Sequence, residues 1–546
     1  MALDQKIVSE LEVALGKDSV STAPSVLYTY GFDASIYHHS PDVVVLPTST
    51  EQVSQVMKIA YAHGIPVTPR GSGTGLCGAA VPIKGGILLS TQKMDKVLNV
   101  SVKDVWVDVQ AGCIYNKLND ELAEYGFFFP PSPGSAEACT VGGMVATNAS
   151  GMRAVKYGAT RDFVLGLTFV KADGSIVHAG TRTIKDASGY QLARFMCGSE
   201  GTLGVITEIT FKLTTKPKKS AYCLCSFDSV LDAGRCISAI IGKPLIPASC
   251  ELMDKVSIDA VNKVLGNPLP QASALIIVEA DGETDEVVER DLKIIAQVAS
   301  ENNAVSVTPS HDKAEIQRWT NARKSVLASL SALKPGYDCV SLADDMGVPI
   351  SKVPDAVERF QEISERHGVT VATYGHASDG NLHTKMVIRS GEKDDWDRAF
   401  QTVDEIFDVC IELGGTVTGE HGVGISKAEN FKKERADEID TLVAIKRAMD
   451  PKNILNPGKG AEFDGDRKRG LRYPCPEYQR RIGEPTGQEA MKTLLRGWRR
   501  RARDDSNLPK SVERSAAEAA EDAADPALST RHDRPHMRTA FLSINV

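Results

Sequence analysis

The stretch PRGSGTGLCGAAVP, residues 69–82, decides how the first half of this chain folds. Residues 64–86 hold seven glycines in 23 positions, far above the average glycine content of about 7%. Three of them fit the GxGxxG spacing of a Rossmann dinucleotide site, but that site needs a helix to begin at the loop. A helix cannot begin here because Pro82, Gly85 and Gly86 follow the loop. The loop is therefore either a nest of backbone N–H groups for a pyrophosphate or a plain glycine-rich turn.

The segments around this loop predict alternating strands and helices. A helix is expected over about 50–63, with Thr48 and Glu51 as a capping box, between short apolar strands. Further on, 105–109 alternates as a strand, and Asp173-Gly174 marks a hairpin between two apolar runs. From about residue 221, strand-like runs alternate with charged helical stretches, which predicts a separate α+β domain.

Composition limits the class of protein. The chain has 546 residues, 42% hydrophobic and 25% charged, with a net charge of −8. Such a chain folds into globular domains, and its charge disfavours nucleic acid as the main partner. The eleven scattered cysteines are typical of reduced thiols in the cytoplasm. No stretch approaches 18 uncharged apolar residues, so no transmembrane segment is expected.

Two later segments point to the ligand of the glycine loop. They are PPSPGSAEACTVGGMVATNASGMRAVKYGATRDFVLG (130–166), which is rich in small residues, and CGSEGTLGVITEITFKL (197–213). Together with PRGSGTGLCG they resemble the FAD-binding (PCMH-type) domain of the vanillyl-alcohol oxidase and p-cresol methylhydroxylase superfamily, over about residues 20–218. Small residues suit this role because a flat ring system must be approached closely on its faces.

The resemblance implies three groups of FAD-binding residues. They are Arg70, Gly71, Ser72, Gly73, Thr74 and Gly75 at the pyrophosphate, Thr140, Gly142, Gly143, Asn148 and Ser150 along the ribityl chain and flavin, and Gly204 and Ile206 at the adenine. Some members of the superfamily tether FAD through a histidine in or near the loop. This loop contains none, so non-covalent FAD is expected.

Histidines and a carboxylate mark a second candidate site. YGHASDGNLHTKM (374–386) places His376 and His383 on either side of an Asp-Gly turn, and GGTVTGEHGVGISK (414–427) presents Glu420 and His421 between glycines. Two histidines and a carboxylate can bind a divalent transition metal with positions left open for substrate. Taken alone, each histidine is better explained as a structural or surface residue.

The same segments resemble the C-terminal domain of FAD-dependent D-2-hydroxyacid dehydrogenases, most closely the D-lactate dehydrogenase and glycolate oxidase branch. The resemblance implies that His376, His383 and Glu420 bind the metal (Zn, Mn or Fe) and that His421 is the base. It places Arg323 of RWTNARKS (318–325) at the substrate carboxylate and Asn456 of KRAMDPKNILNPGK (446–459) at the flavin. One departure is Ser378, which stands where the family motif GHxGDGN has its second glycine.

We therefore predict an α+β protein with an FAD-binding domain of two subdomains. The expected ranges are 1–220 for that domain, 221–425 for the substrate and metal domain, 426–460 for a segment returning to the flavin, and 461–546 for a low-complexity tail. The tail is expected to order only on a partner or not at all. Its basic cluster, 496–503, is either a membrane or partner contact or a solvated segment.

The predicted reaction is oxidation of a D-2-hydroxy acid, D-lactate or glycolate, to the 2-oxo acid. The α-hydrogen is expected to leave as hydride to flavin N5, with a carbanion route as the alternative. Electrons then pass to a non-NAD acceptor: a quinone, a cytochrome, an electron-transfer flavoprotein or an iron–sulfur subunit. Alternatives are a D-2-hydroxyglutarate dehydrogenase and a metal-dependent hydrolase without flavin. The expected location is the cytoplasm, with the inner membrane surface as a peripheral site.

Overall fold

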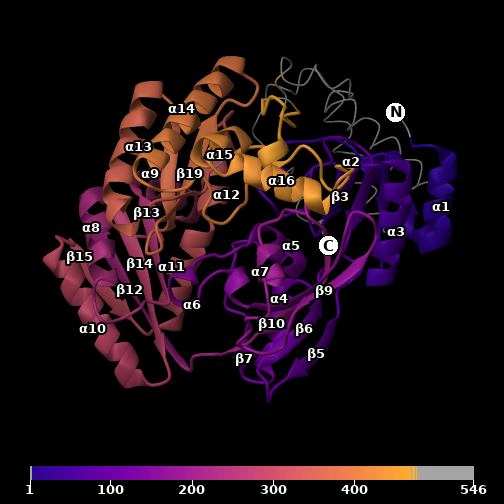
Figure 1. The fold of residues 1–546 in the computed structure, drawn as a ribbon. Coiled ribbons are helices and arrows are strands. Elements are labelled where there is room, and N and C mark those ends of the chain that lie inside the picture. The colour runs from indigo at the N-terminus through magenta and orange to yellow at the C-terminus, as the bar shows by residue number, and fades with distance from the viewer. Residues whose placement is uncertain (1–2, 343, 469, 474, 476–546) are drawn as a thin grey trace, which may run out of the picture.

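The computed structural model of the protein describes residues 3–342, 344–468, 470–473 and 475, in which helices flank four sheets (Figure 1). The largest sheet and its helices lie on the left of Figure 1, and the smaller sheets lie on the right and below. The mixture of helices and sheets agrees with the predicted α+β class. Most of the predicted tail, including its basic cluster, lies outside the described residues.

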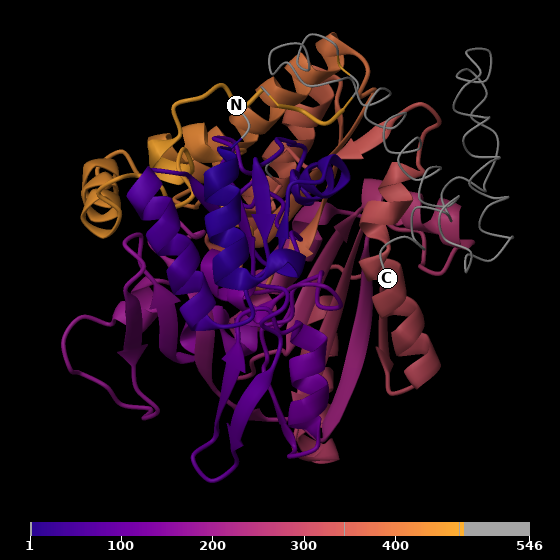
Figure 2. The same ribbon diagram turned by 90° about the vertical axis from the view of Figure 1, so that its right-hand side faces the viewer.

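The N-terminal layer contains a four-stranded sheet in the order β1-β2-β4-β3. Its elements are α1 (Gln5–Leu15), η1 (Lys17–Ser19), β1 (Val20–Ser21), α2 (Pro24–Tyr30), β2 (Val43–Val45), α3 (Thr50–His63), β3 (Val67–Arg70) and β4 (Ile87–Ser90). Strands β2 and β3 both run parallel to β4, which lies between them, and helix α3 connects β2 to β3. This confirms the predicted strand, helix, strand unit, which Figure 2 shows in front.

Helix α3 has the predicted bounds but a different cap. The N-cap is Ser49, whose side chain accepts from the Gln52 N–H at 3.3 Å. The Gln52 side chain in turn accepts from the Thr48 N–H at 2.7 Å. The capping box predicted on Thr48 and Glu51 is therefore wrong by one residue, because two hydroxyl residues precede the helix and both have a partner three or four residues later.

No helix forms in the glycine loop, as predicted. Residues 71–86 join β3 to β4 directly, and Gly73 and Gly78 have φ angles of +77° and +78°. These left-handed conformations are open to glycine at little cost. The loop therefore presents backbone rather than side chains at the end of β3.

The second layer is an antiparallel sheet of five strands in the order β5-β6-β10-β8-β9. Its elements are β5 (Val97–Ser101), β6 (Trp106–Gln110), α4 (Tyr115–Ala123), α5 (Val141–Thr147), α6 (Ala154–Tyr157), η2 (Thr160–Asp162), β8 (Val164–Val170), β9 (Ile176–Gly180), α7 (Leu192–Phe195) and β10 (Val205–Lys212). A short ribbon pairs β7 (Phe127–Phe128) with β11 (Thr214–Thr215). Strands β8 and β9 form the hairpin predicted around Asp173-Gly174.

The third layer is an eight-stranded sheet, in the order β15-β12-β14-β13-β18-β19-β16 with β17 beside β19. Its strands are β12 (Lys219–Phe227), β13 (Ser249–Asp254), β14 (Ala274–Gly282), β15 (Ser306–Ser310), β16 (Asp338–Val340), β17 (Met346–Gly347), β18 (Thr370–His376) and β19 (Asn381–Ile388). Its helices are α8 (Val230–Ile241), α9 (Lys255–Leu265), α10 (Asp285–Glu301), α11 (Lys313–Lys324), α12 (Val326–Ser331), η3 (Ile350–Lys352), α13 (Val353–His367) and α14 (Lys393–Glu412).

Helices cover both faces of this sheet. Along β12, Cys223, Cys225 and Phe227 face the core formed with α8, α10, α13 and α14. Leu224 faces the opposite core, formed with α9, α11 and α12. Successive side chains of a strand point to opposite faces, so a strand buried on both sides is apolar at almost every position. The buried charged residues of this sheet are therefore unusual.

The chain returns to the first sheet after α15 (Ala428–Glu434) and α16 (Ile439–Met449), before the short turn η4 (Gly460–Glu462). The Val67 N–H donates to the Ile454 carbonyl and the Asn456 N–H to the Val67 carbonyl, both at 2.7 Å. The segment thus lies parallel to β3 at the edge of the N-terminal sheet. No helix in the described part of the chain is long and apolar enough to cross a membrane.

Candidate active site

Two neighbouring strands bring the predicted histidines together. Strands β18 and β19 are antiparallel and joined by the turn at Asp379-Gly380, with Tyr374 opposite His383 in the register. Residues two apart share a face of a strand, and so do directly opposed residues. His376 and His383 therefore share one face, and their ring centroids lie 5.2 Å apart.

Ser378 fits this turn. No positive φ angle occurs at this residue, and Gly380 takes the left-handed position with φ of +82°. Ser378 is fully buried, and its hydroxyl has no hydrogen-bond partner among the described residues. The departure from the family motif therefore leaves the turn that carries His376 intact.

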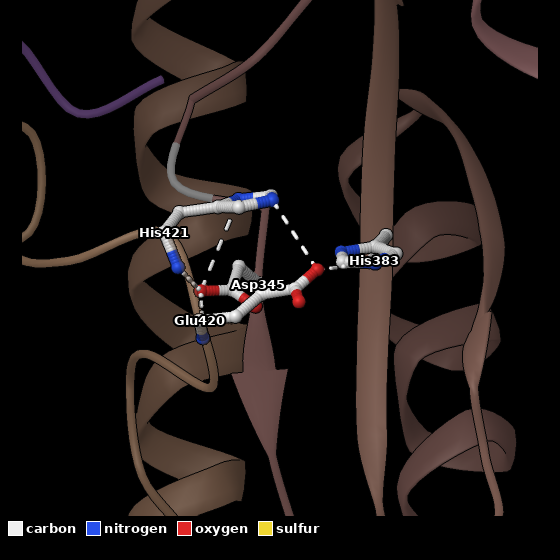
Figure 3. Close-up of side chains that lie close together, drawn as sticks. All are labelled: Asp345, His383, Glu420 and His421. Atoms are coloured by element: carbon white, nitrogen blue, oxygen red, sulfur yellow. Dashed lines mark hydrogen bonds and ion pairs between the residues drawn. The ribbon is translucent and has the colours of Figure 1, made fainter. Parts of the chain in front are cut away.

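Glu420 lies at the centre of three imidazoles. Its Oε1 atom is 3.5 Å from His376 Nε2 and 3.6 Å from Nε2 of both His383 and His421. The rings of His383 and His421 stack, with centroids 5.2 Å apart. Figure 3 shows His383, Glu420 and His421 directed toward one another, together with Asp345. The sequence-predicted ligands and the predicted base thus meet at one point.

Hydrogen bonds at the far side of two rings fix their tautomers. His376 Nδ1 lies 2.6 Å from Glu251 Oε1, and His383 Nδ1 lies 3.1 Å from the Asp344 carbonyl oxygen. A carboxylate and a carbonyl can only accept, so each Nδ1 carries a hydrogen, and Nε2 is the ring atom that faces Glu420. Metal-binding histidines have this arrangement. The donor set and its orientation therefore fit a divalent cation.

Asp345, which sequence reasoning missed, also belongs to the cluster. Asp345, His383, Glu420 and His421 each offer an atom within 4.8 Å of the others, as a metal site requires. The Asp345 carboxylate, however, already accepts five hydrogen bonds. Its donors are the N–H groups of Glu420 and His421 at 2.9 and 2.7 Å, Thr418 Oγ1 and Lys427 Nζ at 3.0 Å, and Asn381 Nδ2 at 2.7 Å. Asp345 is thus better suited to fix the 418–421 loop than to bind a cation.

Burial and neighbouring charges set the protonation of the cluster. Burial raises the pKa of Glu420, but the hydrogen bond and charge of His376, with the charges of the other two histidines, lower it to about 2. Burial lowers the pKa of His421 below its ordinary value, against the opposing effects of Asp345 and Glu420. Near neutral pH, Glu420 is thus a carboxylate and His421 is a neutral imidazole, which can accept a proton.

Arg323 reaches the same region from helix α11. Its Nη2 atom lies 2.6 Å from Glu251 Oε2, and its guanidinium lies 4.7 Å from the centre of the Tyr374 ring. Glu251 is buried in strand β13 at 3% exposure. One buried carboxylate therefore contacts both the predicted ligand His376 and the predicted substrate-binding Arg323. An acidic residue within a buried strand was the signal that could have identified it.

Hydrogen bonds join this cluster to the glycine-rich segments. Ser150 donates from Oγ to Glu420 Oε2 at 2.9 Å. The Glu200 carboxylate accepts from the N–H groups of Val423 and Gly424 at 2.5 and 2.8 Å, and the Cys77 carbonyl accepts from the Ile425 N–H at 2.7 Å. The GEHGVG segment is thus held against the first half of the chain on both sides.

The glycine loop offers unpaired donors. Within the described residues, the backbone N–H groups of 71–76 form no hydrogen bond. A Cβ on Gly71 would lie 2.1 Å from Thr140 Oγ1, and one on Gly73 would lie 2.0 Å from Arg70 Nη2. Arg70 itself donates to the Phe32 carbonyl at 2.6 Å, and Ser72 donates to the Ala138 carbonyl. A row of open N–H groups in which every second residue is glycine fits a pyrophosphate.

The other residues predicted at FAD lie on the second layer or on the returning segment. Thr140 is the N-cap of α5 and Asn148 its left-handed C-cap, with φ of +52°. Gly142 and Gly143 lie in the first turn of α5; Gly204 precedes β10 and packs against Phe169, and Ile206 lies in β10. Asn456 donates to the carbonyls of Ala79 and Glu200 at 2.8 and 2.7 Å, and thus connects two glycine-rich segments.

Comparison with protein families matches most of the chain. Residues 41–180 match the model of an FAD binding domain, and residues 216–460 match the model of the C-terminal domain of FAD linked oxidases. The chain is 36% identical over 460 residues to the glycolate oxidase subunit GlcD of Bacillus subtilis (strain 168), which covers 84% of this chain and 97% of that protein. It is 36% identical over 422 residues to a D-lactate dehydrogenase of Archaeoglobus fulgidus, which covers 76% of this chain and 90% of the relative.

Solved structures share the fold at lower sequence identity. p-Cresol methylhydroxylase with substrate bound superimposes with a TM-score of 0.70 at 18% identity, over 85% of this chain and 99% of that one. An alkyldihydroxyacetonephosphate synthase gives a TM-score of 0.66 at 21% identity, over 83% of this chain and 86% of that one. The predicted fold class and the resemblance to the p-cresol methylhydroxylase superfamily are confirmed.

Proposed function

This chain belongs to the FAD-linked oxidase family of glycolate oxidase subunits and D-lactate dehydrogenases, and on that premise we propose that it oxidises a small D-2-hydroxy acid to the 2-oxo acid. The family match makes it an FAD-linked oxidoreductase of that type. The proposal concerns its substrate, its metal and the roles of its residues.

One observation carries the proposal most: Ser150 of the flavin-side segment donates to Glu420 of the imidazole cluster at 2.9 Å. An oxidation of this kind needs the flavin, the substrate hydroxyl and a base within contact of one another. The direct bond supports a single site formed by both halves of the chain. A flavin-binding module without catalysis would have no need of it.

His421 is proposed as the base. It lies next to Glu420 in the chain, and its neutral form is favoured because burial lowers its pKa. Its Nδ1 atom is buried without a hydrogen-bond partner among the described residues, and its Nε2 atom faces Glu420 Oε1. Removal of the hydroxyl proton by His421 leaves an electron pair on oxygen that expels the α-hydrogen as hydride. The chemistry that FAD supplies when bound is acceptance of that hydride at N5.

His376, His383 and Glu420 are proposed to hold a divalent metal, with Zn, Mn and Fe as candidates. Their nitrogen and oxygen atoms suit such an ion, and because each Nδ1 is taken by an acceptor, the Nε2 atoms are the ones that would bind it. A cation held there would supply Lewis acidity to the substrate hydroxyl and lower its pKa. The residues would thereby assist the proton transfer to His421.

Arg323 is proposed to bind the substrate carboxylate, because a guanidinium can form two parallel hydrogen bonds with it. In the segment after Arg323, neither position is placed as a second cation for a dicarboxylate: Lys334 donates to Thr370 Oγ1 at 3.0 Å, and the Asp338 carboxylate accepts from Ser390 Oγ. This favours D-lactate or glycolate over D-2-hydroxyglutarate. A hydrolase without flavin would leave the FAD-binding domain unexplained.

The test is a substrate panel with the purified, FAD-loaded protein. The visible absorbance of the bound flavin is followed without an added acceptor. Bleaching by D-lactate or glycolate, but not by L-lactate, is the expected result. A flavin that none of the 2-hydroxy acids bleaches would contradict the proposal.

Release of the flavin on denaturation tests the non-covalent attachment. Quinone, cytochrome, electron-transfer flavoprotein and iron–sulfur acceptors are then compared as the oxidant of the bleached protein.

A further inference from the structure

Glu251 stands out among the buried charges that the proposed reaction does not use. It lies in strand β13, within an otherwise mostly apolar sheet, and is 3% exposed. An ionised carboxylate is costly to bury unless its charge is compensated and its oxygens are engaged. Burial raises the pKa of Glu251, but the charges of His376 and Arg323 outweigh it and hold the pKa below its ordinary value. Glu251 is therefore an anion inside the protein.

The two oxygens of Glu251 have different partners. Oε1 lies 2.6 Å from His376 Nδ1, and Oε2 lies 2.6 Å from Arg323 Nη2. One oxygen therefore sets the tautomer and direction of a ring whose Nε2 atom faces Glu420. The other sets the direction of the guanidinium, which also packs on the Tyr374 ring.

We propose that Glu251 is a positioning residue that links metal binding to substrate binding. The proposal rests on the proposed function, in which His376 binds the metal and Arg323 the substrate carboxylate. A bidentate carboxylate between them fixes the distance between the two groups. It thereby fixes how far apart the hydroxyl and the carboxylate of a bound 2-hydroxy acid must lie, which selects acids whose hydroxyl is on the carbon next to the carboxylate.

Strand β13 also offers a matched control. Asp254 is buried to 2% exposure in the same strand and accepts from the N–H groups of Thr373 and Ser257, both at 2.8 Å. It contacts neither His376 nor Arg323 in the described structure. Glu251→Gln and Asp254→Asn both replace a buried carboxylate by an amide of the same size. Any general effect of such a change on the sheet is therefore common to both variants.

The first measurement is the zinc affinity of the FAD-loaded full chain after chelation, by competition with a chelator. Loss of the partner of a metal-binding histidine typically weakens metal affinity by about 10–100-fold. We expect this loss in Glu251→Gln and wild-type affinity in Asp254→Asn. Equal zinc affinity in Glu251→Gln and the wild type would overturn the proposal, whether or not any substrate is oxidised.

The second measurement separates KM from kcat for the acid that bleaches the wild-type flavin. In Glu251→Gln a single accepting oxygen without charge remains for two donors, His376 Nδ1 and Arg323 Nη2, so we expect KM to rise as well as zinc affinity to fall. If Glu251→Gln does not fold, Glu251→Asp keeps the charge but is too short by one methylene to reach both partners, and the same two losses are expected. Wild-type zinc affinity and KM in that variant would equally overturn the linkage. Absence of bleaching in the wild type would instead count against the proposed function.

Discussion

The glycine loop at 71–76 and the cluster around Glu420 are built in opposite ways. The loop has unpaired backbone N–H groups and a glycine at every second position, whereas the cluster consists of buried side chains that contact one another. The loop is formed by the backbone of one short segment, in which glycines leave room for a ligand. The cluster is assembled from strands and loops far apart in the sequence. A substitution in the loop should therefore act by adding atoms that clash with their neighbours. A substitution in the cluster should act by removing atoms that make contacts.

The largest effect is expected where the cluster does chemistry. His421→Ala should lower turnover by about 10²- to 10⁴-fold, as loss of a general base typically does. The bound flavin should be retained, because His421 is not among the residues predicted to bind FAD. Flavin reduction in a single turnover and the flavin absorbance of the purified variant check the two parts. His367→Ala, in helix α13 and paired with Glu405, is the control. Wild-type turnover in His421→Ala would remove this residue as the base.

The next effect concerns the buried pair beneath the cluster. Asp345→Asn leaves Lys427, whose side chain is fully buried, without its anion. Removal of one partner of a buried ion pair typically costs about 3–5 kcal/mol. We expect that loss in the free energy of urea unfolding, with weaker zinc binding because the 418–421 loop loses its acceptor. Adding Lys427→Met should restore part of the stability. An additive double variant would indicate that the two charges do not interact.

A smaller effect on stability is expected in the loop. Gly71→Ala places a Cβ 2.1 Å from Thr140 Oγ1. Such overpacking typically costs about 1–3 kcal/mol, and we expect the variant to lose its flavin during purification while zinc affinity stays unchanged. The flavin-to-protein absorbance ratio measures this. At Gly134 nothing lies within 4 Å of an added Cβ, so Gly134→Ala should retain flavin. Equal flavin content in the two variants would contradict the assignment of the loop.

The smallest effect is expected at the bond that joins the two regions. Ser150→Ala removes the hydrogen bond to Glu420, which typically contributes about 0.5–1.5 kcal/mol. We expect a few-fold lower rate of flavin reduction with flavin content unchanged, since Glu420 keeps its other contacts. Stopped-flow measurement of the reduction step tests this, with the exposed Ser188→Ala as the control. A loss of flavin with an unchanged reduction rate would place Ser150 at the cofactor alone.

Local patterns predicted much of this fold. Helix α3, the β8–β9 hairpin and the helix-free glycine loop follow from periodicity, Asp-Gly signals and proline, each within a short window. The cap of α3 was misplaced because Thr48 and Ser49 both offer a hydroxyl, and sequence alone does not say which one reaches the helix N–H groups.

The sequence predicted residues of the candidate site only where they stand in a recognisable motif. His376, His383 and Glu420 stand in glycine-rich segments that resemble a family, but Glu251 and Asp345 stand in strand-like or loop sequence without a motif. Most of their partners lie more than 70 residues away, as in the hydrogen bond from the His421 N–H to Asp345, which spans 76 residues. Such long-range pairings depend on sheet order, which periodicity does not reveal.

The returning segment has a consequence for biosynthesis. Asn456 and Lys459 hold carbonyls of the glycine loop across sequence separations of 377 to 381 residues, and Lys459 donates to Gly78 and Val81. After the loop has been translated, most of the remaining chain must therefore be synthesised before these carbonyls can accept their hydrogen bonds. These contacts can form only late in translation, so we expect nascent chains that end before Asn456 to be isolated without bound flavin.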